Sequence, residues 1–298
     1  MAASFDVCVI GHVSRDINAI GGVELEPSPG GAAYYSTMVY RRLGLRAAVV
    51  TMVAAPDAPL LQELNDAGVA VFNLPTEVTT TFHNDYPMAH DLDLRVQRVD
   101  ARAGTIAVAA LPNLSARIWH IGPLTETDVE LAMIAHCAER GGLVGMDVQG
   151  LTRIVIDREV SARAPVERMD YLRHVDVLKA DDAEILTYTG ESDIEAAVTR
   201  VRAAGACEVL VTHASAGATI YGPRSALQIE AIPPRQSVDT TGCGDTFLAA
   251  YMTRRLTSDD LRECGEFAAA AAAINIEAVG AFGGTAAEIA ERRAAPRM

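Results

Sequence analysis

The amino-acid sequence predicts an α/β fold in which a central, mostly parallel sheet is covered by helices on both faces. Short apolar strands alternate with helical segments along most of the chain, which indicates parallel strands joined by helical crossovers. Residues 76–111 break this rhythm, because their short alternating stretches are typical of antiparallel strands without intervening helices. We therefore expect a single domain over residues 1–298, with a small β-sheet lid built from about 12–30 and 76–111.

The first half of the chain alternates apolar strands with helices that end at glycines. Gly44 and Gly68 each follow the last apolar turn of a predicted helix, a position that favours glycine. Within the lid region, alternating stretches at 79–86, 94–99 and 105–109 indicate three short strands. The other predicted elements of this half are strands at 5–11, 47–53 and 69–74 and helices at 32–43 and 58–67.

After residue 111 the α/β rhythm returns. In such folds the functional site lies at the carboxyl ends of the parallel strands, so the loops that leave those ends should meet there. The predicted elements are strands at 117–121, 143–147, 175–179 and 208–212, helices at 126–140, 182–189, 194–204, 244–255 and 258–276, and a hairpin at 218–221 and 227–232.

Composition and charge narrow the classes of function. Half of the residues are hydrophobic and 21% are charged, which is typical of a globular chain. The formal net charge of −14 argues against a nucleic-acid partner, because such a protein needs a basic face. Five scattered cysteines without a Cys-x-x-Cys pair indicate free thiols in a reducing cytoplasm. No stretch is long and apolar enough to span a bilayer, so we expect a cytoplasmic protein.

The glycine-rich stretch 238–247, Val-Asp-Thr-Thr-Gly-Cys-Gly-Asp-Thr-Phe, carries the strongest functional signal. Gly242 and Gly244 permit backbone conformations that a side chain would forbid, so successive N–H groups can point into one concavity. An apolar helix follows, and its positive N-terminal end favours a phosphate there. Asp245 stands at the rim, where its carboxylate can accept a proton from an attacking hydroxyl. The alternative interpretation is a plain glycine turn whose aspartate is stabilised by the helix dipole.

The same stretch resembles the second signature of the ribokinase-like (PfkB) carbohydrate kinases, Asp-Thr-x-Gly-Ala-Gly-Asp, with Cys243 in place of the alanine. The resemblance implies a ribokinase-like fold and an ATP-dependent kinase in which Asp245 is the catalytic base. It also implies that the backbone of Gly242, Cys243 and Gly244 forms the anion hole for the transferred phosphoryl group. Further motifs follow in the family's order over essentially the whole chain.

The acceptor is expected to bind between the first strand and the lid. Asp16 and the pair Gly30-Gly31 are similar to the first region of the family, which implies that the aspartate binds substrate hydroxyls. Tyr35 stands where the family often has an asparagine, so it reshapes the sugar pocket. The lid stretch around Asn84 offers polar groups to a polyol, and Arg153 can clamp a phosphate. The alternative for the glycine pair is a helix cap, and that for the lid stretch is ordinary strand packing. For Arg153 the alternative is a surface salt bridge.

The resemblance also implies sites for two cations. The family's Asn-x-x-Glu motif, which organises Mg²⁺ through water near the phosphates, is present as Asp181-x-x-Glu184. An acidic first turn that complements the helix dipole is the alternative for this pair. A monovalent cation such as K⁺ is expected near Asp239.

The nucleotide is expected against the next strand and the last long helix. Thr212 and Gly217 match the family's Thr-x-Gly-x-x-Gly stretch, which lies over the nucleotide, whereas Ala214 replaces its middle glycine. The base is expected near Asn275 and Gly280, although tight helix packing explains the small residues there equally well.

These observations favour a kinase that phosphorylates a hydroxyl of a sugar or cyclic polyol. Tyr35, the lid aromatics and residues 147–153, which resemble the inositol-kinase-like branch, favour a myo-inositol-like acceptor, with nucleosides and ribose-type sugars next. The alternative of another class is a sugar- or nucleotide-binding regulator without turnover, since fold does not fix function. The resemblance also implies a homodimer that pairs through the β lid.

Overall fold

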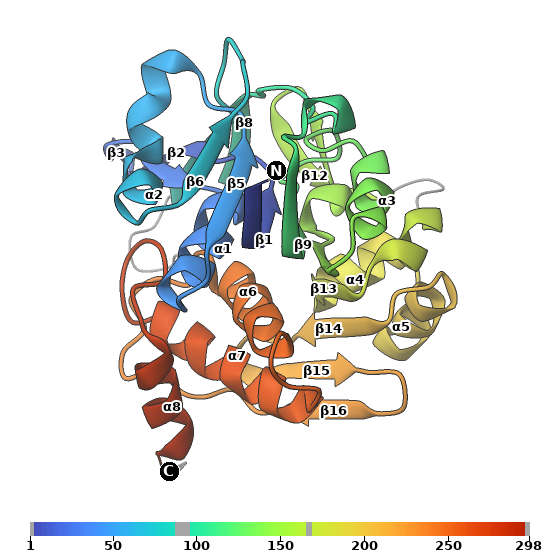
Figure 1. Ribbon diagram of the computed structural model, residues 1–298. Helices are drawn as coiled ribbons and strands as arrows, with labels where there is room; N and C mark the ends of the chain where they lie inside the picture. The colour runs from blue at the N-terminus through green and yellow to red at the C-terminus, as the bar shows by residue number, and fades with distance from the viewer. Residues whose placement is uncertain (1–2, 87–95, 165–168, 296–298) are drawn as a thin grey trace.

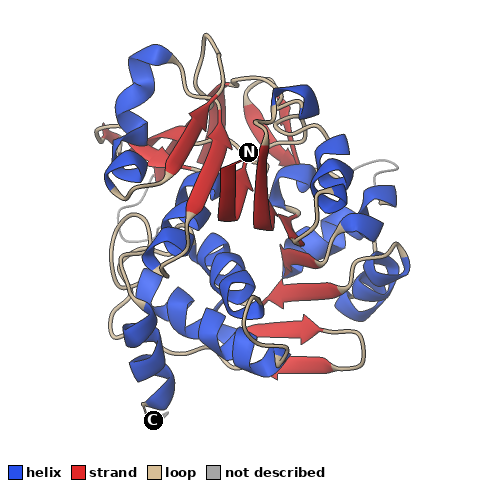
Figure 2. Cartoon of the chain, in the orientation of Figure 1, coloured by secondary structure: helices blue, strands red, loops and turns tan. Residues whose placement is uncertain are grey.

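The computed structural model describes residues 3–86, 96–164 and 169–295. Its framework is a nine-stranded sheet beside a smaller seven-stranded sheet, and helices pack against the larger one (Figures 1 and 2). The predicted α/β class and the presence of a second, smaller sheet are both confirmed.

The nine-stranded sheet is parallel from β14 to β6, whereas both pairs that involve β15 are antiparallel. Its central strands are buried apolar runs, which suits a parallel sheet covered on both faces. In sheet order the strands are β16 (Ala226–Ile229), β15 (Ala218–Tyr221), β14 (Glu208–Thr212), β13 (Val177–Asp181), β10 (Leu143–Asp147), β9 (Leu114–Ile121), β1 (Ala3–Ile10), β5 (Ala47–Thr51) and β6 (Ala70–Asn73).

Helices cover this sheet on both faces and create two apolar cores. Strand β1 shows the division, because Val7 and Val9 belong to one core and Cys8 and Ile10 to the other. The first core is covered by α1 (Ala32–Arg42), α2 (Gln62–Asp66), α6 (Cys243–Arg255), α7 (Leu261–Asn275) and α8 (Ala286–Ala294). The second is covered by α3 (Ala132–Glu139), α4 (Asp182–Thr189) and α5 (Ile194–Ala203).

The smaller sheet collects strands from three separate parts of the chain. Its order is β11-β12-β8-β7-β2-β3. Strand β4 pairs with the first three residues of β2, which β3 does not reach. Phe82 and Val99 on one face of it pack against Ala32 and Leu124 of the main body. The strands are β2 (Ser14–Ile20), β3 (Val23–Glu24), β4 (Ser28–Gly30), β7 (Thr81–Tyr86), β8 (Val96–Ala101), β11 (Arg153–Ile156) and β12 (Glu159–Ala162).

Several predicted elements differ from the structure. The expected strand at 105–109 is wrong, because Ile106 makes only an isolated bridge to Val129 and residues 108–110 form a 3₁₀ turn. The helix expected from residue 126 begins only at Ala132, since the carboxylate of Asp128 caps a preceding turn through the amides of Leu124 and Thr125. Strands β11 and β12 and helix α8 were not predicted.

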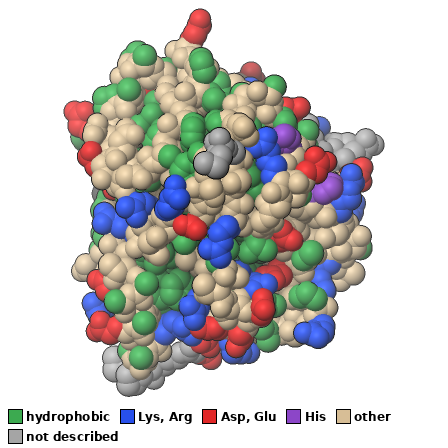
Figure 3. Space-filling model, viewed as in Figure 1, with side chains coloured by type: hydrophobic (Ala, Val, Ile, Leu, Met, Phe, Trp, Pro, Cys, Tyr) green, Lys and Arg blue, Asp and Glu red, His purple; other side chains and the backbone are tan. Residues whose placement is uncertain are grey.

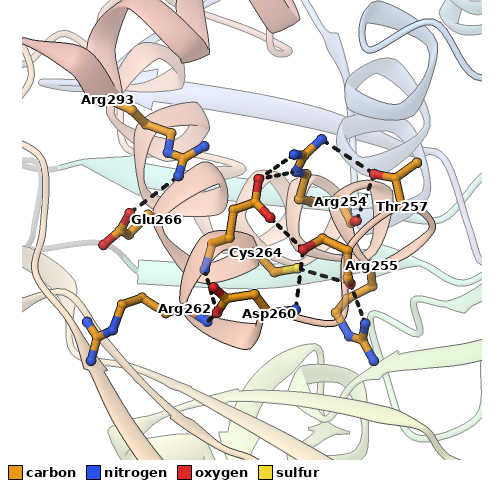
Figure 4. A network of polar contacts seen from close by, with 10 residues as sticks. Arg254, Arg255, Thr257, Asp260, Arg262, Cys264, Glu266 and Arg293 are labelled. Carbon is orange, nitrogen blue, oxygen red and sulfur yellow. Dashed lines mark hydrogen bonds and ion pairs between the residues drawn. The ribbon is translucent and has the colours of Figure 1, made fainter.

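Polar contacts join the end of α6 to the start of α7 (Figure 4). The guanidinium of Arg254 donates to Glu263, whose other oxygen accepts from Ser258 at 2.5 Å. The carboxylate of Asp260 accepts from the first amides of α7, which fixes where that helix begins. These contacts hold together the two helices that support the glycine-rich turn.

The surface carries charges of both signs. Figure 3 shows basic and acidic side chains interspersed over one side of the molecule rather than gathered into a basic face. Among the described residues, none of the helices has the length and apolar character needed to cross a membrane.

Candidate active site

The carboxyl ends of three adjacent parallel strands meet the glycine-rich turn. Strands β10, β13 and β14 end at Asp147, Asp181 and Thr212, and the turn at 239–242 leads directly into α6. Helix α6 packs against both β10 and β13. Residues that are nearly 100 positions apart in sequence are therefore brought together at one edge of the sheet, as the fold class predicts.

Gly242 gives the turn its shape. Its φ of +73° lies in the left-handed region, and a Cβ at this position would lie only 2.6 Å from Cδ1 of Tyr35. The ring of Tyr35, which is only 8% exposed, therefore packs directly on the turn. Glycine is needed here both for the backbone conformation and for this close approach.

Hydrogen bonds from α7 hold the rest of the turn in place. The buried amide of Asn275 donates to the carbonyl of Thr241 at 3.0 Å and accepts from the hydroxyl of Thr246 at 3.2 Å. The carboxylate of Asp239 accepts from the amide of Thr241 at 2.9 Å. Asn275, which the sequence placed near the nucleotide base, thus has its side-chain amide engaged in supporting the turn. The expected K⁺ near Asp239 stays a prediction.

The backbone donors at the start of α6 differ from the predicted anion hole only at Cys243. The amide of Cys243 donates to the carbonyl of Thr240 at 3.2 Å, so it closes the turn. Within the described chain, the amides of Gly242, Gly244 and Asp245 have no acceptor, as expected at the start of a helix. The predicted donors Gly242 and Gly244 are thus available, and Asp245 adds a third N–H group beside the positive end of the helix dipole.

A buried ion cluster lies beneath Gly244. The Nζ of Lys179 is 2.9 Å from Oδ2 of Asp147 and 3.5 Å from Oε2 of Glu184. All three side chains are almost completely buried. A Cβ on Gly244 would lie 2.9 Å from the same Nζ, so the ammonium group touches the turn itself.

Neither Lys179 nor Asp147 was among the site residues predicted from the sequence. Lys179 lies inside the strand Val177-Leu178-Lys179-Ala180, where hydrophobic periodicity gives it no prominence. One signal was available, because Lys179 is the only lysine among the 25 basic residues of Lys and Arg type.

Asp181 and Glu184 cap α4 and face the same region. The amide of Glu184 donates to Asp181 at 2.7 Å, and the amide of Asp181 donates to Glu184 at 2.8 Å, which is a capping box. Burial alone would raise the pKa of Glu184, but Lys179 outweighs it and holds that pKa below its ordinary value. The described residues contain no group of three metal-ligating side chains. Two partly engaged carboxylates fit a Mg²⁺ ion that is held mostly through water and phosphate.

The carboxylate of Asp245 is poised to accept a proton near neutral pH. Burial, reinforced by the negative charge of Asp147, raises the pKa of Asp245 to about 7, and Lys179 opposes this rise. A general base works best when its pKa is close to the operating pH. The position of Asp245 at the start of α6, beside free amides, is that of a base next to an anion site.

The predicted acceptor residues Asp16 and Gly30 contact each other near Tyr35. A Cβ at Gly30 would lie 2.2 Å from Oδ2 of Asp16, and Ser14 donates to the other oxygen of Asp16 at 2.6 Å. After burial, the charges of Asp16, Asp239 and Asp245 are the main causes that raise the pKa of Tyr35. Tyr35 is therefore within electrostatic range of both the predicted acceptor aspartate and the predicted base.

Gly31 fixes the entry to α1 beside Asp16. Its φ of +88° is left-handed, and a Cβ there would lie 2.7 Å from the carbonyl oxygen of His12. Gly31 is also the residue before the first turn of α1, which agrees with the helix-cap alternative, and the contact of this glycine pair with a substrate stays a prediction.

A row of amides crosses the smaller sheet. The side chain of Asn84 donates to Asn18 at 3.0 Å and accepts from Gln97 at 2.8 Å, across three paired strands. Gln97 and Arg153 also line a cavity of about 330 Å³ between this sheet and α4, together with Asp181 and Glu184. Asn84 and Arg153 thus lie on the side of the smaller sheet that faces the main body.

The predicted nucleotide residues surround the loop after β14. Gly217 has a φ of +97°, and a Cβ there would lie 2.1 Å from the carbonyl oxygen of Ile229. The ring of His213 contacts Asp182 at 2.6 Å and Thr219 at 2.8 Å, so both its nitrogens have structural partners. Thr212 ends β14, and Gly280 lies in an open loop after α7 with no atom near its absent Cβ. Their contact with a nucleotide stays a prediction.

A buried carboxylate at a helix start, free amide donors beside it and a buried cation close to them are the groups that a phosphotransferase site requires. A family model described as "pfkB family carbohydrate kinase" matches residues 4–286, so the chain belongs to this family. The predicted family and the predicted transfer of phosphate to a sugar or similar alcohol are thereby confirmed.

Two curated relatives are kinases of sugars and nucleosides. A ribokinase from Arabidopsis thaliana is 34% identical over 119 residues, which are 38% of this chain and 31% of that protein. This match therefore spans about a third of the ribokinase. A cytidine kinase from Thermococcus kodakarensis is 24% identical over 273 residues, which are 87% of this chain and 91% of that protein.

Three solved structures are similar over nearly the whole chain. A sulfate complex of a pyrophosphate-dependent kinase in the ribokinase family is 25% identical, with a TM-score of 0.84 over 95% of this chain and 99% of that chain. Such a kinase complexed with a pyrophosphate analog and myo-inositol is 24% identical, with a TM-score of 0.84 over 96% and 99%. Arabidopsis thaliana ribokinase complexed with ribose and ATP is 21% identical, with a TM-score of 0.76 over 99% and 100%. The latter two likenesses concern the fold alone.

Replacing Gly242 by alanine tests the turn. We expect Gly242→Ala to lower the free energy of unfolding by about 2–4 kcal/mol, because the methyl group adds a clash with Tyr35 to the strain of a left-handed backbone. Gly190→Ala is the matched control, since Gly190 has a φ of +74° with no atom near its absent Cβ. It should lose only about 1 kcal/mol. Equal losses in urea denaturation would show that Tyr35 does not constrain the turn.

The pH dependence of turnover tests the state of Asp245. We expect kcat/KM to rise with pH and to level off above about pH 7, because the base must be deprotonated and its pKa is about 7. The residual activity of Asp245→Asn should lack this acid limb. An acid limb near pH 4 in the wild-type enzyme would contradict the raised pKa.

The same raised pKa predicts how stability depends on pH. Between about pH 4 and 7 the folded protein binds a proton at Asp245 that the unfolded chain has lost, so wild-type stability should fall as pH rises. Asp245→Asn carries no such charge, and its advantage should grow through this window to at most about 4 kcal/mol, the equivalent of a pKa raised from 3.8 to about 7, and stay constant above it. Chemical denaturation at several pH values measures the difference, and an advantage that shrinks with rising pH would contradict the assignment.

Proposed function

We propose that this chain transfers the terminal phosphoryl group of ATP to a hydroxyl of a cyclic polyol of the myo-inositol type. The observation that carries the proposal is the arrangement around Tyr35, whose ring packs on Gly242 and whose hydroxyl is within electrostatic range of both Asp16 and Asp245. An acceptor that is bound by Asp16 would have its hydroxyl directed toward the base and the free amides.

Each residue of the site has a separate role in the proposed phosphoryl transfer. Asp245 takes the proton of the acceptor hydroxyl as its oxygen attacks the terminal phosphorus, and the bond from that phosphorus to the bridging oxygen breaks to release ADP. The amides of Gly244 and Asp245 stabilise the charge on the transferred group. Asp181 and Glu184 would hold Mg²⁺ through water, and the ion would neutralise charge on the donor phosphates. The smaller sheet acts as a lid that excludes water.

The preference for a cyclic polyol rests on the walls of the acceptor site. Tyr35 places a ring beside the turn, and the amides of Asn18, Asn84 and Gln97 form a row of hydrogen-bonding groups on the neighbouring sheet. A ring with hydroxyls around its rim presents one apolar face to an aromatic side chain and polar edges to amides. Nucleosides and ribose-type sugars are the next candidates, and the full-length similarity to a cytidine kinase favours testing them.

Inorganic pyrophosphate is the second candidate for the donor. The 25%-identical structure with a TM-score of 0.84 is that of a pyrophosphate-dependent kinase. The amides of Gly244 and Asp245 would bind the phosphoryl group of either donor, because they contact only the phosphate end.

A matrix of donors and acceptors tests the proposal. Wild type and Asp245→Asn are each assayed with Mg²⁺ and either ATP or pyrophosphate against cyclitols, pentoses, hexoses and nucleosides. We expect a cyclitol to give phosphorylated product with the wild type, and Asp245→Asn to be about 10²–10⁴-fold slower. A nucleoside as the sole acceptor would overturn the polyol, and full turnover by Asp245→Asn would overturn the base.

A further inference from the structure

Lys179 stands out because the chain uses arginine everywhere else. It is the only lysine in 298 residues, and it is 4% exposed in the middle of β13. An arginine would be too long and planar for this place, because the ammonium already lies 2.9 Å from the position of a Cβ on Gly244. The site therefore requires a compact, permanent cation at this point.

The two carboxylates beside Lys179 leave part of its bonding capacity unused. An ammonium group has three N–H donors. In the described chain its partners are Oδ2 of Asp147 at 2.9 Å and Oε2 of Glu184 at 3.5 Å, which account for two of them. The third N–H is left on the side of Gly244, where the backbone amides of the turn are also without an acceptor.

The two carboxylates fix the position of the ammonium rather than its charge balance. Asp147 and Glu184 come from β10 and α4, and together they carry one negative charge more than the lysine, so the net charge of the cluster does not itself attract an anion. A purely structural ion pair would be complete with one carboxylate. A second carboxylate positions the ammonium, so that its remaining donor has a fixed direction.

We infer that Lys179 is a catalytic residue that donates one N–H to the transferred phosphoryl group, while Asp147 and Glu184 position its side chain. No proton leaves Lys179 in the reaction: the acceptor proton goes to Asp245, and Lys179 only stabilises charge as one P–O bond forms and the other breaks. This inference rests on the proposed function for the location of the phosphoryl group at the Gly244 and Asp245 amides.

A charge-matched pair of variants separates a catalytic from a structural role. Lys179→Met should lower kcat by about 10²–10³-fold with little change in the KM of the acceptor, the usual effect of losing one donor to a transition state. The double variant Asp147→Asn/Lys179→Met removes both charges of the close pair and so restores the buried charge balance. We expect the double variant to remain at least 10²-fold impaired, and recovery to near wild-type kcat would overturn the inference.

Arg255→Met controls for the loss of a largely buried, ion-paired cation as such. Arg255 pairs with Glu208 at 3.1 Å. Glu208 is the first residue of β14, so this ion pair lies at the opposite end of the strand from Thr212. We expect Arg255→Met to lose stability and to keep its kcat. A loss of kcat as large as that of Lys179→Met would show that any buried ion pair has the same effect, and would overturn the specific role of Lys179.

The single lysine also allows a direct measurement without turnover. Protein made with ¹³C-labelled lysine and a lysine-free tag gives one side-chain NMR signal. We expect this signal to shift when aluminium fluoride, a mimic of the transferred phosphoryl group, is added to protein with Mg²⁺ and ADP. Bound fluoride seen by ¹⁹F NMR with an unchanged lysine signal would overturn the inference.

The outcomes for the inference and for the proposed function can be told apart. If Asp245→Asn keeps full turnover, the proposed base is wrong, whereas the kinetics of the lysine variants and the lysine signal still test Lys179. If Lys179→Met turns over within threefold of the wild type, Lys179 is not catalytic, and the test of the base with Asp245→Asn is unaffected.

Discussion

The arrangement of this site depends on one buried cation that holds three elements together. Lys179 on β13 contacts Asp147 at the end of β10 and Glu184 in the first turn of α4. Burying an isolated charge is prohibitively unfavourable, so each of these side chains is stable only because the others are present. Burial alone would lower the pKa of Lys179, but its two carboxylates hold that pKa above its ordinary value, so the lysine remains charged. The turn before α6 then lies directly on this cluster.

Tyr35 connects this cluster to the acceptor side. It belongs to α1, which packs against α6, and its ring touches the turn at the one residue that has no side chain. The same ring is influenced by the charge of Asp16, which the smaller sheet contributes. One aromatic side chain is thus close to both of the carboxylates to which the proposed function gives a role.

The sequence was sufficient for the elements that are buried on both faces, for the turn and for the existence of a smaller sheet, but not for the strand pairing of that sheet or for the ion cluster. Strands such as β10 and β14 are short apolar runs, and the turn has a glycine where the backbone needs one, so both are local signals. Strand β2 is half-buried, and its pairing with β7 joins residues more than 60 positions apart, which no local pattern contains. Asn275 supports the turn only because α7 ends beside it, and Lys179 is hidden among apolar neighbours.

The smaller sheet has a consequence for how acceptor recognition can change. Asp16 pairs with Phe82, and Arg98 pairs with Glu159, so strands from three distant stretches share one hydrogen-bonded ladder. Each stretch is separated from the next by strands of the main sheet. A new acceptor specificity therefore cannot be transplanted from a relative as one continuous loop, because register and side-chain contacts must match across all three stretches at once. Changes in specificity should proceed by single side chains on this scaffold rather than by exchange of segments.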